Sequence, residues 1–219
     1  MINKEKFYKA YISVFGRIVK DATVNCIDAI LDQFDISSIK IKHIEKMAYM
    51  LATVRHECGS GMLPITENLN YSARRLTQVW PSRFPTIDHA SKYSNNPEML
   101  GDYVYGSRLG NGRFEGFKFR GRGFIQITGY VNYKKFSELL GVDLVANPDL
   151  AKDKGIGARI LVNGMVGGLF TGKKLSGCIN SGGVDYYSAR NIVNADASRV
   201  GHSIARDAKL FEDILRHAK

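Results

Sequence analysis

Two carboxylates, Glu57 and Glu67, lie ten positions apart on either side of a segment that contains two glycines and a proline. Two carboxyl groups hydrolyse a glycosidic bond when one protonates the leaving oxygen and the other activates water. On one continuous helix ten residues would span about 15 Å, more than the ~6.5–9.5 Å of an inverting pair. A break at Gly59, Gly61 and Pro64 lets the chain fold back, so the spacing permits such a pair without requiring it.

The two carboxylates have different expected surroundings. Glu57 borders the apolar stripe of a helix expected over residues 41–58 and lies in its last turn. Partial burial and the negative end of the helix both disfavour a charged carboxylate, so we expect a raised pKa for Glu57 and the role of general acid. Glu67 lies in a polar loop beside Asn68 and is expected to act as the base. Two solvated surface carboxylates are the ordinary alternative.

A zinc site is the third interpretation of this stretch. His56 and Glu57 match the start of the H-E-x-x-H motif, but the fifth position is Ser60 and no other histidine is near in sequence. The three cysteines are widely separated and odd in number, which favours reduced thiols over disulfides or a cysteine-rich metal site. We therefore expect no metal and no cofactor.

A second polar segment, GRGFIQITG at 121–129, could complete the chemistry. Its alternating pattern predicts an extended strand with Phe124, Gln126 and Thr128 on one face and two isoleucines on the other. Gln126 would then hydrogen-bond a sugar, and Thr128 would hold the water that Glu67 deprotonates. Thr128 is equally suited to cap the helix that follows.

The net charge of +10 and the pI near 9.5 indicate a polyanionic partner. RGRGFIQI is similar to the central motif of RNA-recognition domains, but Arg122 stands where a base-stacking aromatic is needed. The flanking segments are also helical or irregular rather than strand-rich. Nucleic acid is therefore not the expected partner, and an acidic cell-wall polymer or an anionic lipid surface remains.

The fold class expected from periodicity is mainly α with one small extended element. Residues 81–118 are expected to be irregular apart from a short helix at TIDHASKYS, and 35–40 to form a turn and helix start. The N-terminus lacks the unbroken apolar core of a signal peptide. Helices are expected in 5–34, 41–58, NYSARRLTQVW, 129–141, ARILVNGMVGGLF and SIARDAKLFEDILRHA.

Four ordered motifs are together similar to glycoside hydrolase family 19, closest to its branch of phage endolysins and related chitinases. They are AYMLATVRHECGSGMLPITENLNYSA, YGSRLGN, FRGRGFIQITGYVNY and GMVGGLFTGKKLS. The resemblance covers roughly residues 45–215. It implies a lysozyme-like, mainly helical, two-lobed fold with a central substrate cleft and no metal cofactor. It also implies one catalytic domain, with an N-terminal helical part at 1–40, a core at 41–219 and no separate wall-binding module.

The resemblance assigns roles residue by residue. Glu57 matches the family's general acid and Glu67 its second carboxylate, while Thr128 matches the hydroxyl residue that holds the nucleophilic water. The family's Thr after His-Glu is Cys58 here. Substrate-contacting or cleft-supporting positions are matched by Gln126, Asn132 and Tyr133.

Two further assignments are less direct. The family's late asparagine has two candidates, Asn180 and Asn194, and the helical context downstream favours Asn194. Tyr71, Tyr103 and Tyr105 could stack on sugars, although packing is the ordinary role for each.

The expected function is hydrolysis of β-1,4 bonds in bacterial peptidoglycan by an inverting mechanism, as a monomeric endolysin. The alternatives are a chitinase and a non-catalytic wall-binding protein. Without a signal peptide, the protein is expected in the host cytoplasm and would act on the wall after release. The C-terminal helix mixes basic and apolar residues, so it could contact an anionic outer membrane or simply dock on the core.

Overall fold

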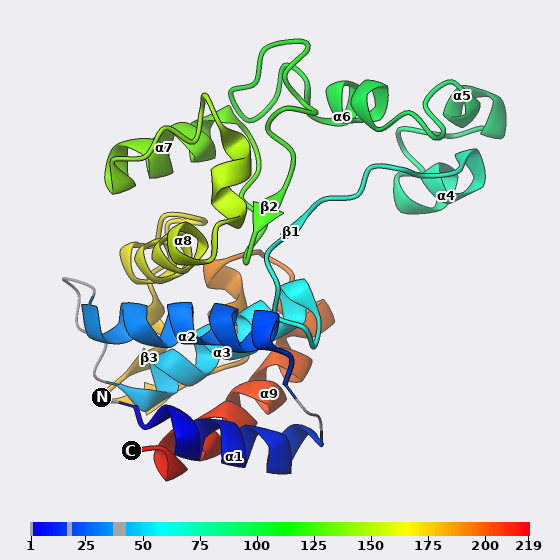
Figure 1. The fold of residues 1–219 in the computed structure, drawn as a ribbon. Helices are drawn as coiled ribbons and strands as arrows, with labels where there is room; N and C mark the ends of the chain where they lie inside the picture. The colour runs from blue at the N-terminus through cyan, green and yellow to red at the C-terminus, as the bar shows by residue number, and fades with distance from the viewer. Residues whose placement is uncertain (1, 17–18, 37–42) are drawn as a thin grey trace. The chain divides into compact units, whose positions relative to one another are not determined.

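The computed structural model describes residues 2–16, 19–36 and 43–219, which are mainly helical (Figure 1). The expected fold class is therefore confirmed. The chain forms two compact units, one built from Met1–Pro64 with Lys152–Lys219 and the other from Ile65–Ala151. The helix start expected within 35–40 and the boundary expected between the parts 1–40 and 41–219 lie outside the described residues. The single catalytic domain and the central cleft stay predictions.

The first unit is built almost entirely from helices. The helical character expected for 5–34 is confirmed as two helices, and Gly16 ends the first of them in a left-handed conformation (φ 63°) and donates its N–H to Ile12 O. Without a Cβ, glycine adopts this conformation at no steric cost. The helices are α1 (Lys4–Phe15), α2 (Asp21–Ile36), α3 (Ile44–Cys58), α8 (Lys154–Gly167) and α9 (Ala197–His217).

Helix α3 is the centre of this unit and is buried from Ile44 to Val54 on most of its faces. It packs along α9, which also packs on α1, while α2 packs on α8 (Figure 1). The apolar face of α9 is buried, with Phe211 and Ile214 at 0% exposure. Docking of this helix on the core is therefore confirmed, and its apolar face is not available to a membrane.

Short elements between α8 and α9 complete the first unit. Strands β3 (Ile179–Asn180) and β4 (Gly183–Val184) form a small antiparallel hairpin. The 3-10 helices η2 (Leu175–Gly177) and η3 (Ser188–Ile192) lie on either side of it in the chain. In the described part of the chain, no helix is both long and apolar enough to cross a membrane.

The second unit holds one short β-pair and several helices. Strand β1 (Ile65–Thr66) pairs antiparallel with β2 (Arg122–Gly123), and Ile65 lies opposite Gly123. A cluster of buried apolar side chains that includes Phe84 and Leu100 packs together α4 (Ala73–Val79), α5 (Ile87–Ser91) and α6 (Pro97–Tyr105). Helix α7 (Tyr130–Leu140) and the 3-10 helix η1 (Pro148–Lys152) follow later in the chain.

Helix α6 lies in the region that the sequence analysis expected to be irregular, so that expectation is wrong. Two residues stabilise the start of this helix: the Asn96 side chain accepts the Met99 N–H, and Pro97 occupies the first helical turn. An Asn cap followed by Pro is a common helix start. The helix at TIDHASKYS is confirmed as α5.

The extended strand expected over 121–129 is also wrong. Arg122 and Ile127 exchange backbone hydrogen bonds of 3.2 and 3.0 Å, which closes a tight turn between them. Gly123 (φ 89°) and Gln126 (φ 54°) take left-handed conformations within that turn. The side chains therefore do not alternate, and Phe124 is as buried as the isoleucines.

Candidate active site

Glu57 lies in the last turn of α3, which ends at Gly59, as the sequence predicted. Its side chain is only 18% exposed, and its Oε1 accepts a hydrogen bond of 2.5 Å from Arg190 Nη1. Arg190 lies on η3 and is 3% exposed. The general-acid candidate is therefore in contact with a buried positive charge that the interpretation of the sequence did not include.

Arg190 is itself held by a second carboxylate. Its Nε donates to Asp196 Oδ1 at 2.5 Å, and Arg199 Nη2 donates to Asp196 Oδ2 at 2.5 Å. Burial opposes the charge on Arg190, but hydrogen bonds with Asp196 and Glu57 outweigh burial and raise its pKa. The Arg190 hydrogen bond, with Arg199, lowers the pKa of Asp196. The result is a fixed Glu57–Arg190–Asp196 array within the first unit.

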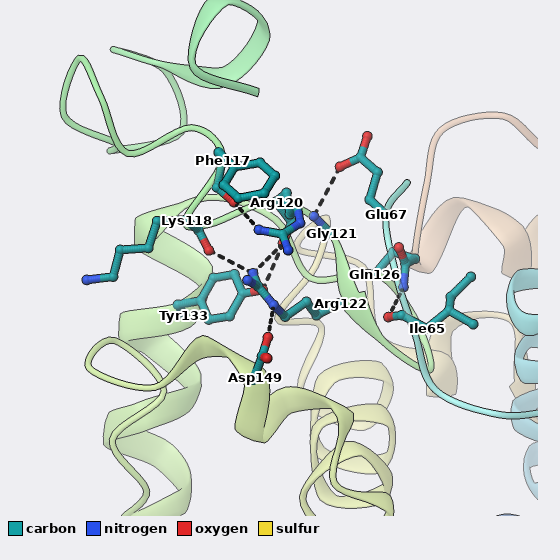
Figure 2. Close-up of polar contacts among 10 residues, drawn as sticks. All are labelled: Ile65, Glu67, Phe117, Lys118, Arg120, Gly121, Arg122, Gln126, Tyr133 and Asp149. Atoms are coloured by element: carbon teal, nitrogen blue, oxygen red, sulfur yellow. Dashed lines mark hydrogen bonds and ion pairs between the residues drawn. The ribbon is translucent and has the colours of Figure 1, made fainter. Parts of the chain in front are cut away.

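Glu67 is held within the second unit by three contacts. Its N–H donates to Gly121 O at 2.8 Å, and Gly121 N–H donates back to Oε2 at 3.1 Å (Figure 2). The Tyr105 hydroxyl donates to Oε1 at 2.7 Å. Both carboxylate oxygens thus have a donor, and the side chain is half-buried rather than loose in a polar loop.

Sugar stacking and ordinary packing are the two roles considered for Tyr105, and the structure adds a third, because its hydroxyl donates to Glu67. Burial, together with the charge and the hydrogen bond of Glu67, raises the pKa of Tyr105 well above its usual range. The phenol therefore keeps its proton and remains a donor through neutral and alkaline pH.

Thr128 and Glu67 both lie next to Gly121. A Cβ added to Gly121 would lie 3.4 Å from both Glu67 Cβ and Thr128 Oγ1, and 2.9 Å from Gln126 Oε1. The absence of a side chain at Gly121 therefore lets these three groups converge. The alternative role for Thr128 as a helix cap is wrong, because Gly129 occupies the N-cap of α7 and Thr128 Oγ1 donates to Gln126 O at 3.0 Å.

Arg122 organises the loop that carries Gly121. It is 5% exposed, and its Nη1 donates to Lys118 O at 2.7 Å and to Arg120 O at 3.2 Å (Figure 2). Its Nε donates to Asp149 Oδ1 at 2.7 Å. Buried carbonyl groups need such donors, so Arg122 fixes the backbone on which Glu67 rests.

Tyr133 lies beneath this loop and supports it. It is 0% exposed, and its hydroxyl donates to Arg120 O at 2.8 Å and accepts from Arg122 Nη1 at 3.0 Å. Of the two roles that the resemblance implies, this burial favours support of the cleft over contact with substrate.

Gln126 and Asn132 also use their amide groups inside the protein. Gln126 Nε2 donates to Ile65 O and to Gly123 O, each at 3.0 Å, which joins the turn to β1. Asn132 Nδ2 donates to Thr128 O at 2.8 Å. Both residues therefore shape the surroundings of Thr128, and their contact with a sugar stays a prediction.

Tyr71 packs partly buried against the core of the second unit, with its ring centroid 5.5 Å from that of Trp80. Asn194 is exposed, and its N–H donates to Arg190 O at 3.1 Å, so it belongs to the segment that holds Glu57. The Asn180 side chain instead bonds within its hairpin, to Gly182 N. The choice of Asn194 over Asn180 stays a prediction.

No described residues form a group of three or more His, Cys, Asp or Glu side chains that could hold a metal ion. The candidate residues described above carry carboxylates, guanidinium groups and hydroxyls. Arg190 and Asp196 were missed in the sequence because 133 positions separate Arg190 from Glu57. No local signal connects them.

Comparison with known proteins agrees with the motifs, although no family model matches the chain. A "Glycosyl hydrolase family 19 domain-containing protein" of Haemophilus influenzae is 40% identical over 135 residues, which are 59% of this chain and 65% of that protein. Over these 135 residues the chain is similar in sequence to glycoside hydrolase family 19. The aligned part spans just under two thirds of the relative's length.

Two solved structures show the family 19 fold. Chitinase C from Streptomyces griseus HUT6037 has a TM-score of 0.59 at 18% identity, over 98% of this chain and 92% of that one. A structure of a bacterial family 19 chitinase has a TM-score of 0.51 at 17% identity, over 98% and 94%. At such low identity these likenesses support the fold alone.

Proposed function

We propose that this chain is a family 19 glycoside hydrolase that cleaves β-1,4 bonds of peptidoglycan with inversion. One observation carries the proposal: both carboxylates are held by charge-assisted donors rather than left loose in solvent. Arg190 holds Glu57, while the Tyr105 hydroxyl and the Gly121 N–H hold Glu67. Fixed orientation of this kind is what acid–base catalysis requires.

In the proposed reaction, Glu57 gives its proton to the glycosidic oxygen as the bond from that oxygen to the anomeric carbon breaks. Water attacks that carbon from the opposite face, and Glu67 takes the proton that the water loses. Thr128 Oγ1, beside Glu67, would accept a hydrogen bond from the attacking water. Afterwards Glu57 is ionised and Glu67 protonated, and exchange with solvent restores both.

Arg190 would favour proton transfer from Glu57 to the glycosidic oxygen. Its attraction to Glu57 is strongest once the carboxyl group has lost its proton, so the contact stabilises the state after proton transfer. Asp196, which bonds the same guanidinium, keeps Arg190 in place while the charge on Glu57 changes.

The substrate class rests on charge and on the resemblance. A net charge of +10 favours association with an acidic wall polymer, and the motifs are closest to phage endolysins. A chitinase is the second candidate, because the solved structures with this fold include chitinases. The same two carboxylates would serve either glycan.

Mass spectrometry of digests separates the two candidates. Purified peptidoglycan and chitin oligomers are incubated with the protein, and the products are identified by mass. We expect muropeptides with new reducing ends, whose masses also reveal which sugar is released. Rapid cleavage of chitin oligomers with no release from peptidoglycan would reverse the assignment.

Paired variants test the residues themselves. Glu57→Gln and Glu67→Gln should each lower the hydrolysis rate by about 10²–10⁴-fold, the usual contribution of a positioned acid or base. Glu138→Gln is the matched control, because Glu138 lies on α7 with its side chain 69% exposed. Near-normal hydrolysis by either active-site variant, folded as judged by circular dichroism, would exclude the proposed roles. Glycan binding without new reducing ends in the wild type would indicate a wall-binding protein.

A further inference from the structure

A surface hollow of about 590 Å³ lies within the second unit, along α6 and the loop that follows it. This volume falls in the ~300–1,000 Å³ range of small-ligand sites. Its lining does not include Glu57, Glu67 or Thr128. The residues that carry the argument are Tyr93, Glu98, Asp102, Tyr103, Arg113 and Phe114.

The floor of the hollow has a fixed shape. A Cβ on Gly106 would lie 2.3 Å from both Asp102 O and Arg113 O, and one on Gly116 would lie 2.2 Å from Gly101 O. The loop backbone therefore rests directly on α6, which only glycine permits at these positions. The hollow is formed before any ligand arrives, so binding would not need to order the loop.

The apolar part of the lining is exposed to an unusual degree. Phe114 is 75% exposed and Tyr103 is 38% exposed, and the Tyr103 ring centroid lies 4.4 Å from that of Tyr93. The Arg113 guanidinium lies 5.1 Å from the Phe114 ring centroid. Phe114 contributes little to the core at this exposure, whereas aromatic rings gathered at one hollow provide a ligand with a large contact area.

The charged part of the lining selects the ligand. Glu98 and Asp102 are acidic and Arg113 is basic, so both signs of charge face one hollow in a chain of net charge +10. Asp102 Oδ1 already accepts the Phe117 N–H at 3.0 Å, but this contact is neutral and leaves the negative charge unbalanced. A polyanion would meet two carboxylates in the hollow, and a neutral sugar would form an ion pair with none of its three charged groups. A ligand with an ammonium group beside a carboxylate matches both signs.

We propose that this hollow binds the peptide stem of peptidoglycan through the zwitterionic end of its diamino acid. The ammonium group pairs with Glu98 and Asp102, the carboxylate pairs with Arg113, and the alkyl chain lies on Phe114. The inference rests on the proposed function and deepens it, because it makes the stem peptide a determinant of substrate choice. Chitin, which has no stem, would not use the hollow.

Isothermal titration calorimetry on the whole protein tests this assignment. The probe is a synthetic stem tripeptide that ends in diaminopimelate with a free amino group, and the comparison probes are the same peptide acetylated on that amine and chitotetraose. We expect the free peptide to bind at least about tenfold more tightly than the acetylated one, since the loss of one charge pair of this kind is worth more than 1.4 kcal/mol.

Variants locate the site. Glu98→Gln, Arg113→Gln and Phe114→Ala should each weaken binding of the free peptide at least about fivefold, the threshold for an interface residue that matters. Glu138→Gln and Leu139→Ala are the controls; Leu139 is 50% exposed on α7, and neither residue lines the hollow. On peptidoglycan, the three variants should raise KM, while their kinetics on chitin oligomers should match the wild type.

The outcomes separate this inference from the proposed function. Hydrolysis of peptidoglycan without measurable peptide binding at about millimolar concentration overturns the inference and leaves the function intact. Equal binding of the acetylated peptide, or peptide binding that the three variants do not weaken, also overturns it. Peptide binding through these residues by a protein that cleaves only chitin supports the hollow and overturns the proposed function.

Discussion

Removal of one hydroxyl tests whether Glu67 depends on its partners. Tyr105→Phe deletes the hydrogen bond of 2.7 Å to Oε1 and leaves Oε2 with the Gly121 N–H at 3.1 Å. The lost bond is the shorter of the two and joins a phenol to a carboxylate, the charge-assisted class. It should orient the base more than it stabilises the fold.

The magnitude follows from the class of bond and from exposure. A hydrogen bond to a charged group contributes about 1.5–3 kcal/mol. Because Tyr105 is only partly buried, water can replace part of this, and we take the lower half of the range. At 1.36 kcal/mol for each factor of ten, a loss of about 1.5–2.25 kcal/mol lowers kcat/KM about 13- to 45-fold.

The assay is initial-rate hydrolysis of peptidoglycan and of chitin oligomers, with urea unfolding as the check on folding. Tyr8→Phe is the matched control, because the Tyr8 hydroxyl also donates to a carboxylate at 2.7 Å, that of Asp28, and neither residue belongs to the candidate site. Because the pKa of Tyr105 is raised well above its usual range, the alkaline limb of the pH profile should be the same in wild type and Tyr105→Phe. A kcat/KM within twofold of wild type on both substrates would refute the role assigned to this bond.

Three further substitutions test the rest of the site. Asp196→Asn should cost about 1–3 kcal/mol at neutral pH, because Arg190 loses a charged partner. Because the pKa of Asp196 is depressed in the folded protein, its ionised carboxylate stabilises the fold above the ordinary pKa of 3.8, and this stabilisation is lost as pH falls through the folded pKa. The free energy of unfolding in urea, measured from pH 7 to 3, should therefore fall less steeply in Asp196→Asn than in the wild type. An equal fall in both proteins would contradict this. Arg122→Met should cost about 3–5 kcal/mol by urea unfolding, since a buried charge with several partners is removed, and a cost under 1 kcal/mol would show that water replaces it. Gly121→Ala places a methyl group 2.9 Å from Gln126 Oε1, so it should displace Glu67 or Thr128 and lower kcat at least about tenfold. The midpoint of urea unfolding should change little. A kcat equal to that of the wild type would show that the crowding is relieved without moving Glu67 or Thr128.

Helix boundaries near the site were predictable because their signals are local. The apolar repeat that leads to Glu57 ends at a glycine, and α3 ends at Cys58 as expected. Helix α7 likewise runs from Tyr130 to Leu140 and is closed by Gly141 at φ 65°. Periodicity and glycine together identify such ends without any knowledge of tertiary contacts.

The turn at 121–129 was not predictable from alternation. The alternating residues are apolar and polar in the order a strand requires, yet two left-handed conformations, at Gly123 and Gln126, reverse the chain. A left-handed glutamine has no clear sequence signal, because the Gln126 side chain is held by Ile65 O from another segment. The register of these few residues is decided by tertiary contacts.

The carboxylates could be chosen from the sequence, but their partners could not. Glu57 and Glu67 stand in recognisable motifs, whereas Arg190 and Tyr105 are ordinary residues at distances of 133 and 38 positions. Expecting a raised pKa for Glu57 from its own helix alone left out the guanidinium that contacts it. Electrostatics at a site depends on every element packed around it, and only the fold brings those elements together.

The first unit is discontinuous, which has a consequence for biosynthesis. The second unit, Ile65–Ala151, is a single stretch and can fold as soon as it leaves the ribosome. Helix α3 emerges earlier but packs on α9, and Arg190 is made long after Glu57. A nascent chain therefore carries the acid without its guanidinium partner until residues 188–196 have been translated. The Glu57–Arg190–Asp196 array is therefore completed late, and a chain whose synthesis stops before residue 188 has Glu57 without its partner.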